Sequence, residues 1–300
     1  SSDLDFLNRE NLGEIRRTLM LIVAVTLLIE AAGAVMIYFS WGGTAFASPQ
    51  EKIFQSVFHS VSAFCNAGFS LFSDNLAAPG LAMNARMNIA VAGLIILGGL
   101  GFITIVNIAS IRPWGRAQNR LRHRLTAHTR IVLASSGILL ASGAILFYVL
   151  EYHNTLAGLN WWEKIMASFF QSVTTRTAGF NTVDIGAMAM PSTLLFLLFM
   201  FIGASPGSTG GGIKTTTASL VFLSAMHHVR GKGSIEIGNR RIPPTVVERA
   251  FAALVFALLL VALSVFFLSM FEPFPLIDIL FEIVSAMGTV GLSRGITFAL

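Results

Sequence analysis

The chain has 300 residues, of which 54% are hydrophobic and only 12% are charged, with a formal net charge of +5. About a quarter of the residues of a typical soluble domain are charged, so this composition excludes an ordinary soluble protein and predicts one that lies in a lipid bilayer. The one cysteine, Cys65, excludes a fold held together by disulfides within the chain.

Five apolar stretches are long enough to cross the hydrocarbon core of a membrane, which takes about 20 residues of α-helix. In chain order they are 18–38, 87–111, 131–150, 191–226 and 250–271. Three further apolar runs are too short to cross, and we expect each to form one short helix: 53–64, 165–175 and 276–287. The sequence therefore predicts an all-α membrane protein in which long spans alternate with short helices.

The charged residues are distributed unevenly between the two sides of these spans. Fourteen of the 20 Lys and Arg residues lie before the first span, between the second and third, or after the fourth. Cytoplasmic loops carry an excess of Lys and Arg, so this side is predicted to be cytoplasmic. The opposite loops hold eight acidic residues against five basic ones. These acids either form an outer vestibule that concentrates cations or are scattered, solvated loop charges.

Each short helix leads into a glycine-containing tetrapeptide, and the three tetrapeptides form an internal repeat. They lie 111 and 112 residues apart and read Asn66-Ala67-Gly68-Phe69, Thr177-Ala178-Gly179-Phe180 and Thr289-Val290-Gly291-Leu292. The middle copy is one residue shorter between its helix and its tetrapeptide. Repeats of this kind commonly pack around an axis along the membrane normal, so we expect pseudo-symmetric packing.

A short helix that ends at a glycine turn suits cation binding at membrane depth. Irregular backbone is tolerated there only where it is buried in protein or lines water. Glycine permits conformations that turn carbonyl oxygens toward an axis, and rings of such oxygens replace the hydration shell of a cation. Ser48 to Glu51 has the pattern of a capping box and Asn160 to Glu163 a weaker version, whereas the third helix, near Pro275, lacks a clear cap. These caps would place negative helix ends near the tetrapeptides.

The segments around the tetrapeptides, 60–69, 172–180 and 285–292, are similar to the second, third and fourth filter segments of the Trk/Ktr/HKT potassium transporter family. The likeness runs through nearly the whole chain and is strongest to the bacterial Ktr membrane subunits. In that family, four repeats of outer helix, pore helix and inner helix surround one pore. The resemblance implies potassium uptake across the cytoplasmic membrane by a multi-pass homodimer on a cytoplasmic nucleotide-binding ring. It also implies that potassium is the substrate and that no other cofactor is needed.

The resemblance assigns roles to segments and residues. The residues that would line the filter are Asn66, Ala67, Gly68, Thr177, Ala178, Gly179, Thr289, Val290 and Gly291. Residues 1–111 would form the second repeat, 112–228 the third with a broken inner helix, and 229–300 the outer helix and pore loop of the fourth. Since one repeat takes about 111 residues, the chain holds fewer than three, and we expect it to be a fragment. The first filter segment, with which the family's potassium–sodium discrimination is associated, is absent.

The fourth span is interrupted by a glycine-rich segment, 203–214. It contains Gly203, Gly207, Gly210, Gly211, Gly212 and Lys214, together with a proline that breaks helix. It resembles a phosphate-binding loop only superficially, because Ile213 precedes the lysine and no strand leads into it. A kinked packing helix is one interpretation. The resemblance implies another, an intramembrane gate below the filter, and a lysine near the bilayer centre, which costs about 2.5 to 3.5 kcal/mol, favours a functional role.

Other polar residues support weaker hypotheses. Glu30 is expected to pair with a neighbouring repeat, and Arg176 to brace the pore helices rather than to contact ions. The basic loop 112–130 suits anionic lipid or a cytoplasmic partner, and membrane topology explains its charge without nucleic acid. A carrier coupled to another cation, such as sodium, stays open. A membrane-embedded enzyme would need convergent acid, base or metal-binding residues, and the predicted spans contain no such set, so we expect no enzyme activity.

Overall fold

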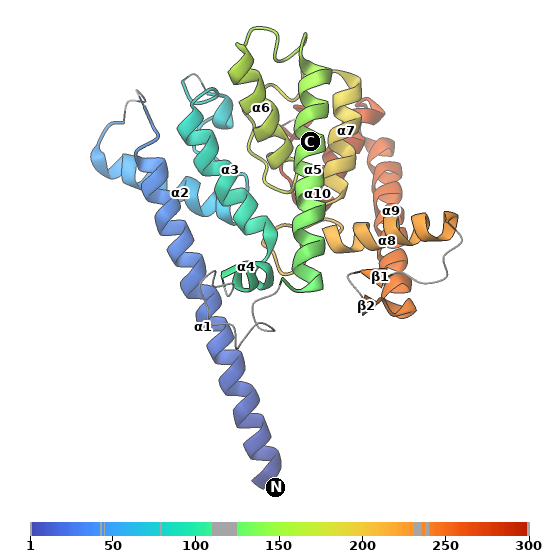
Figure 1. Ribbon diagram of the computed structural model, residues 1–300. Helices are drawn as coiled ribbons and strands as arrows, with labels where there is room; N and C mark the ends of the chain where they lie inside the picture. Colours follow the sequence, from blue (N-terminus) through green and yellow to red (C-terminus); the bar gives the residue numbers. More distant parts are fainter. Residues whose placement is uncertain are drawn as a thin grey trace.

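The computed structural model describes residues 2–42, 44, 46–78, 80–109, 125–230, 236–237 and 240–298, and the side chains of these residues except 2–15, 236–241 and 298. Helices dominate it, and the longest run roughly parallel from one end of the molecule to the other (Figure 1). The all-α membrane fold predicted from the sequence is confirmed in its class.

A long helix followed by a short one occurs three times along the chain, and we call the two the outer helix and the pore helix after the roles that the resemblance implies. The pairs are α1 (Ser2–Tyr38) with α2 (Pro49–Phe64), α5 (Ala127–Glu151) with α6 (Trp161–Thr174), and α9 (Pro244–Phe271) with α10 (Leu276–Met287). The helices α2, α6 and α10 are the three short helices that the sequence predicts, each within a few residues of its expected bounds. Each of them packs against the outer helix before it.

In the first two copies the outer helix crosses its pore helix at a glycine. Ser60 of α2 donates a hydrogen bond to a carbonyl oxygen of α1 (2.7 Å), and Ser172 of α6 donates one to a carbonyl oxygen of α5 (2.8 Å). Gly33 of α1 lies beside Ser60, and Gly143 of α5 lies beside Ser172, so closely that a Cβ on either glycine would overlap the serine hydroxyl. Small residues allow such close helix approach in membranes. The same contact at matching positions supports the repeat.

Three of the described helices are long and apolar enough to cross a membrane. They are Arg16–Tyr38 of α1, Ala127–Glu151 and Pro244–Phe271. Only 11%, 22% and 6% of their most apolar windows are buried within the described structure. Their apolar side chains, such as Leu28 and Phe256, therefore face outward, where they would be costly in water and are suited to lipid.

The predicted span 87–111 is wrong as a single helix. The helix α3 (Ala85–Leu100) stops at Gly101, and α4 (Phe102–Ala109) turns away from it by 100°. Gly101 has a φ of 84°, which glycine adopts readily and other residues resist. A Cβ at this position would also lie 2.5 Å from the carbonyl oxygen of Pro206. The bend thus depends on a contact with a distant segment, which the apolar pattern does not reveal.

The predicted span 191–226 is broken, as its glycines indicate. The helix α7 (Met190–Phe201) runs beside α5, and α8 (Thr215–Val229) lies across the long helices (Figure 1). Residues 202–214 connect the two helices and form no helix of their own. We call residues 203–214 the glycine-rich segment below.

A short β-ribbon between α8 and α9 departs from the all-α prediction. The strands β1 (Glu236–Ile237) and β2 (Arg240–Arg241) pair antiparallel, with Glu236 opposite Arg241. The ribbon lies in the same half of the view in Figure 1 as α4 and the start of α5.

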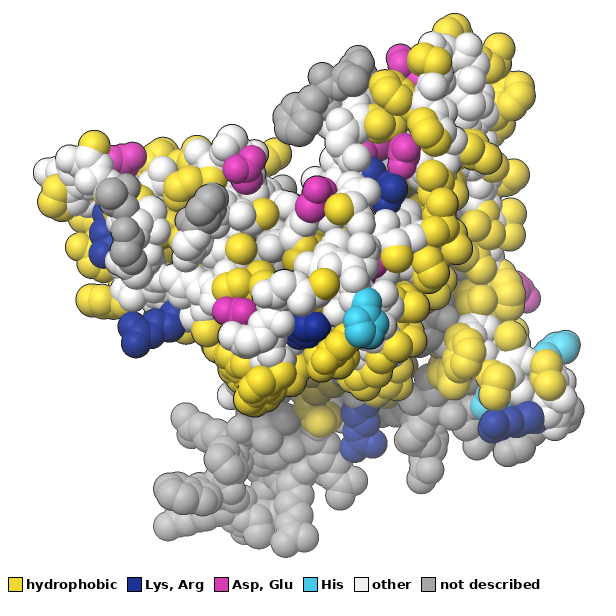
Figure 2. Space-filling view, turned by 90° about the horizontal axis from the view of Figure 1, so that it is seen from above, with side chains coloured by type: hydrophobic (Ala, Val, Ile, Leu, Met, Phe, Trp, Pro, Cys, Tyr) yellow, Lys and Arg dark blue, Asp and Glu magenta, His cyan; other side chains and the backbone are white. Residues whose placement is uncertain are grey.

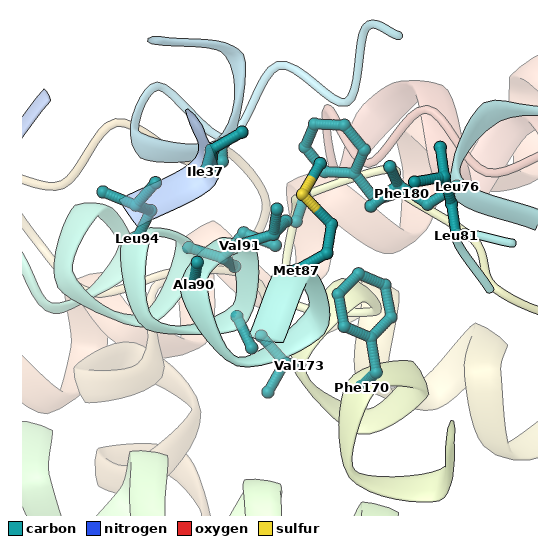
Figure 3. Packing of buried hydrophobic residues seen from close by; sticks show 14 of the residues in the cluster. Ile37, Leu76, Leu81, Met87, Ala90, Val91, Leu94, Phe170, Val173 and Phe180 are labelled. Atoms are coloured by element: carbon teal, nitrogen blue, oxygen red, sulfur yellow. The ribbon is translucent and has the colours of Figure 1, made fainter. Parts of the chain in front are cut away.

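Buried apolar side chains pack behind the tetrapeptides in two clusters. In the first, shown in Figure 3, Met87 and Val91 of α3 meet Phe170 and Val173 of α6, and Phe180 completes the packing. The second cluster joins α5, α6, α7 and α10 to the third tetrapeptide. Because such interiors are close-packed, they hold the tetrapeptides in fixed positions.

Candidate functional site

The starts of the pore helices are fixed by caps of different quality. At α2, the Ser48 hydroxyl accepts a hydrogen bond from the backbone N–H of Glu51 (3.1 Å), while the Glu51 carboxylate binds the N–H of Ala47 (2.7 Å). At α6, both hydrogen bonds of a capping box join Asn160 and Glu163. The cap that is weaker in sequence is therefore the complete one, and α10 has no side-chain cap, as predicted. All three helices point their partly negative carboxyl ends toward a tetrapeptide.

The three tetrapeptides, which we call the three strands although they form no β-sheet, share an unusual backbone conformation. In each, the first residue and the glycine have positive φ, and the residue between them does not. The first residues are Asn66, Thr177 and Thr289, with φ of 52°, 70° and 52°, and the glycines are Gly68, Gly179 and Gly291, with 71°, 79° and 86°. Positive φ in a non-glycine residue costs about 1 to 3 kcal/mol and persists only where the surroundings impose it. Such alternation turns successive peptide groups to one side of the strand.

A hydroxyl group at the end of each pore helix holds the carbonyl oxygen that follows the tetrapeptide glycine. We call these three contacts the hydroxyl clasps. They are Ser62 to Phe69 (2.8 Å), Thr174 to Phe180 (2.5 Å) and Ser285 to Leu292 (2.6 Å). The middle clasp spans six residues instead of seven, so it absorbs the one-residue difference seen in the sequence. Each clasp fixes the outer end of one strand against its own helix.

The glycines bring the three strands into contact with one another. A Cβ on Gly68 would lie 2.5 Å from the carbonyl oxygen of Ala178, and a Cβ on Gly179 would overlap that of Val290. A Cβ on Gly291 would lie 3.8 Å from the Cα of Gly179. The strands therefore approach so closely that side chains at the first two glycines have no room. The structure brings all nine residues of the predicted filter set together.

The side chains at the first tetrapeptide positions face one another and the glycine-rich segment. The side chains of Asn66 and Thr177 lie 3.2 Å apart, in either orientation of the amide. The hydroxyl of Thr289 accepts a hydrogen bond from the N–H of Gly211 (2.9 Å), and Gly210 lies so close to Thr177 that a Cβ would overlap its hydroxyl. The glycine-rich segment thus touches two of the three strands directly.

Hydrogen bonds to α2, α3 and α4 hold the glycine-rich segment in place. Thr209 donates from its hydroxyl to the carbonyl oxygen of Phe64 (3.1 Å) and from its N–H to that of Gly98 (3.3 Å). Gly207, with a φ of 69°, accepts a hydrogen bond from the N–H of Phe102 (3.0 Å). These contacts explain why α3 ends where it does: its last turn is occupied by another part of the chain.

The remaining members of the segment close it on itself. Gly203 packs against Gly212, where a Cβ would lie 2.8 Å from the Cα, and Gly212 has a φ of 69°. The Lys214 ammonium group donates to the carbonyl oxygen of Gly210 (2.6 Å). Lys214 therefore has a partner inside the segment, and it precedes the first residue of α8.

A cavity of about 600 Å³ opens on the side of the strands away from the glycine-rich segment. Asp74, Asn75 and Asp184 line it together with Gly179 and Gly291. Figure 2, which views the molecule from above, shows acidic side chains spread over this face. Arg294 lines the same cavity, so the hollow holds a guanidinium group as well as two carboxylates, and the acidic vestibule stays a prediction. A second cavity, of about 710 Å³, lies between the first and third strands and reaches Gly210.

Two features of the site were missed in the sequence. Arg294 forms an ion pair with Asp278 of α10 (2.6 Å) and donates to the hydroxyl of Thr193 in α7 (2.8 Å), while Glu282 accepts from the Arg294 N–H (2.9 Å). Two acids four residues apart in a short apolar helix were a usable signal for this. Asn75, discussed below, gave none, because it lies in an irregular loop seven residues after Gly68.

The hypotheses on isolated polar residues have mixed outcomes. Glu30 contacts Cys65, which belongs to its own repeat (3.7 Å), and its pairing with a neighbouring repeat stays a prediction. Arg176 lies between α3, α5 and α6, where its Nε is buried without a hydrogen-bond partner among the described residues. It does not brace the pore helices by hydrogen bonds from this atom.

Comparison with known proteins identifies the class. The family model for TrkH, described as a cation transport protein, matches residues 2–300. The chain belongs to this family, which consists of membrane transporters and not of enzymes. The crystal structure of the potassium transporter TrkH from Vibrio parahaemolyticus has the same fold, with a TM-score of 0.71 at 18% sequence identity, covering 93% of this chain and 58% of that one.

Several curated relatives are similar in sequence. A Ktr system potassium uptake protein B from Vibrio alginolyticus is 36% identical over 97% of this chain and 62% of its own length. The protein of the same description from Bacillus subtilis is 39% identical over 82% of this chain and 53% of its own length. The potassium/sodium uptake protein NtpJ from Enterococcus hirae is 34% identical over 97% of this chain and 63% of its own length. The chain thus spans between 53% and 63% of the length of these relatives.

Proposed function

We propose that this chain provides three sides of a selectivity filter through which potassium ions enter the cell across the cytoplasmic membrane. The observation that carries the proposal is the repeated positive φ at Asn66, Thr177 and Thr289 and at the glycine two residues after each. Relatives described as potassium uptake proteins supply the identity of the ion.

Ion selection is assigned to backbone carbonyl oxygens. The alternating φ values favour strands whose carbonyl groups turn to a common axis, and the glycines let three such strands meet. Carbonyl oxygens then replace the hydration shell of the ion. The carboxyl ends of α2, α6 and α10 add negative potential beside the strands, and Asp74 and Asp184 raise the cation concentration in the outer cavity.

Gating is assigned to the glycine-rich segment, with Gly203, Gly207, Gly210, Gly211, Gly212 and Lys214 as its main members. The contacts from Gly210 to Thr177 and from Gly211 to Thr289 support this assignment, since they place backbone directly below the strands. An ion that leaves the filter toward the cytoplasm would meet this segment first. The glycine-rich segment must therefore move aside before the protein can conduct potassium.

The proposed assembly follows the repeats. Residues 1–111, 112–228 and 229–300 correspond to the second, third and fourth repeats, and the first repeat would occupy the second cavity, between the first and third strands. Unsatisfied backbone in that cavity would cost several kcal/mol per group if lipid filled it. The partners we propose are a second copy of the subunit and a cytoplasmic nucleotide-binding ring, which would face the side that the Lys and Arg residues predict to be cytoplasmic.

A carrier coupled to sodium is the second candidate. The observation that favours it is the similarity to a relative described as a potassium/sodium uptake protein. The two candidates differ in one measurement: a coupled carrier moves potassium only when sodium is present, whereas a filter conducts potassium alone.

The test is potassium flux through the protein expressed from its complete reading frame and reconstituted in liposomes. Gly68→Ser and Gly179→Ser should each weaken potassium affinity or selectivity, because the new side chain overlaps the neighbouring strand. Gly80→Ser is the matched control: its φ of 83° is equally unfavourable, yet nothing lies within 4 Å of the added atom. Filter variants with the same flux and affinity as the control would overturn the proposal.

A further inference from the structure

The side-chain amide of Asn75 bridges two of the three strands. Its Nδ2 lies 3.2 Å from the carbonyl oxygen of Gly68 and 3.4 Å from that of Gly179. Asn75 follows Gly68 by seven residues, so the chain leaves the first strand, turns, and returns over its outer end. One NH₂ group therefore contacts the glycine carbonyls of two neighbouring strands.

The orientation of this amide is fixed by its own surroundings. The Asn75 Oδ1 accepts a hydrogen bond from the N–H of Leu76 (2.8 Å), so the NH₂ group must be the part that faces the strands. The reverse orientation would place an amide oxygen against two carbonyl oxygens, which repel it. Two hydrogens on one nitrogen can serve two acceptors, so both contacts can be satisfied together.

The backbone at Asn75 is also held rigidly. Its N–H donates to the carbonyl oxygen of Phe72 (3.1 Å), and its φ is 55°, a left-handed value that asparagine tolerates better than most residues. The next residue, Leu76, is fully buried in the apolar cluster that contains Phe180. The loop carrying Asn75 is thus anchored in the same core that supports the second strand.

Among the residues that the structure describes, no equivalent contact is made from the matching position of the second copy. The residue seven positions after Gly179 is Gly186, which has no side chain and whose N–H binds Asp184 instead (2.9 Å). The bridge therefore links the first and second strands and has no counterpart at Gly186 of the second copy.

We propose that Asn75 is a positioning residue that sets the separation of the Gly68 and Gly179 carbonyl oxygens at the outer end of the filter. The inference rests on the proposed function and adds a determinant of selectivity outside the tetrapeptides. The amide holds the two oxygens at a fixed distance from one nitrogen, and its donated hydrogens reduce their negative potential toward an ion. Without it, the two strands lose their shared link beyond the glycines.

Two substitutions separate this role from other possibilities. Asn75→Gly keeps the left-handed backbone and removes the donor. Asn75→Asp keeps the shape of the side chain but offers carboxylate oxygens where the NH₂ group stood. Ser73→Ala is the control, since Ser73 lies exposed in the same loop and makes no hydrogen bond among the described residues.

The measurement is the ratio of potassium to sodium flux through liposomes that contain the protein from its complete reading frame. Losing hydrogen bonds of ordinary strength corresponds to a change of roughly threefold to tenfold, so we expect the ratio to fall by that factor in both Asn75 variants and to stay constant in Ser73→Ala. Equal changes in both fluxes in Asn75→Asp, with the ratio unchanged, would mean that only vestibule charge matters and would overturn the inference.

Gly68→Ser, measured in parallel, tells failure of this inference from failure of the proposed function. If Gly68→Ser alters the ratio and the Asn75 variants do not, the filter assignment stands and the role of Asn75 is refuted. If neither alters it, the filter assignment itself is refuted, and the inference with it.

Discussion

The ammonium group of Lys214 lies 2.6 Å from the carbonyl oxygen of Gly210, and the intervening residues close into a loop around that contact. Gly210 is the residue that lies against Thr177 in the second strand. The positive charge of Lys214 is thereby stabilised by a backbone carbonyl dipole. The same contact ties the start of α8 to the residue beneath the proposed filter.

Replacing Lys214 by Met should raise the resting potassium flux. The substitution removes the donor to Gly210 and keeps most of the length of the side chain, so the segment loses one charge-assisted hydrogen bond, worth about 1.5 to 3 kcal/mol. A segment that is held less firmly should leave its blocking position more often. Flux into liposomes, per amount of purified protein, measures the effect.

Ser219→Ala is the control for this substitution. The Ser219 hydroxyl binds a carbonyl oxygen within α8 (2.7 Å) and does not touch the glycine-rich segment. If folded Lys214→Met protein conducts no more than Ser219→Ala, the segment is a packing kink and not a gate.

Removing a hydroxyl clasp should weaken the apparent affinity for potassium without abolishing folding. Ser62→Ala and Ser285→Ala each delete one hydrogen bond to the carbonyl that follows a filter glycine. Each loss is expected to cost about 0.5 to 1.5 kcal/mol in the ordering of that strand. The concentration of potassium that half-saturates uptake should rise in both variants.

Ser142→Ala provides the comparison for the clasps. Ser142 donates to a carbonyl oxygen inside α5 (2.7 Å), far from the strands in sequence and without a role in the site. Identical uptake curves for Ser62→Ala, Ser285→Ala and Ser142→Ala would show that the clasps do not influence the strands.

The bend at Gly101 should be sensitive to the smallest side chain. Gly101→Ala forces a residue with a Cβ into a φ of 84° and pushes that atom toward the Pro206 carbonyl. Strain of this kind costs about 1 to 3 kcal/mol, so the midpoint of thermal unfolding in detergent should fall.

Gly137→Ala should instead raise the midpoint of thermal unfolding. Gly137 lies in α5 with nothing within 4 Å of the added atom, and an alanine in a helix is about 0.5 to 1 kcal/mol more favourable than a glycine. If Gly101→Ala is as stable as Gly137→Ala, the bend is not fixed by the glycine.

The parts of the fold that depend on local chemistry could be predicted from the sequence. The pore helices α2, α6 and α10 follow from short apolar runs, and the break in 191–226 follows from its glycines. The convergence of the tetrapeptides followed from their repetition, because equivalent segments in a pseudo-symmetric protein meet at its axis. The residues of the predicted filter set all lie there.

The parts that depend on contacts between distant segments could not be predicted. Gly101 reads as one more small residue in an apolar stretch, and its conformation is decided by Pro206 and Gly207, more than 100 residues later. Asn75 lies in a polar loop whose sequence does not show where it returns. The prediction that the cap of α2 is better than that of α6 is also wrong. The Glu51 carboxylate binds the N–H of Ala47 and not that of Ser48, which a capping box would use.

The unequal length of the hydroxyl clasps bears on how the copies can be exchanged. Thr174 reaches Phe180 across six residues, while Ser62 and Ser285 reach their partners across seven, yet all three strands have matching φ values. The register of each strand is therefore set by the hydroxyl and the glycine together and not by a fixed number of residues between them. A chimaera that transplants 285–292 in place of 174–180 gains one residue, and it should keep the strand in phase only if the hydroxyl travels with the glycine as a single cassette.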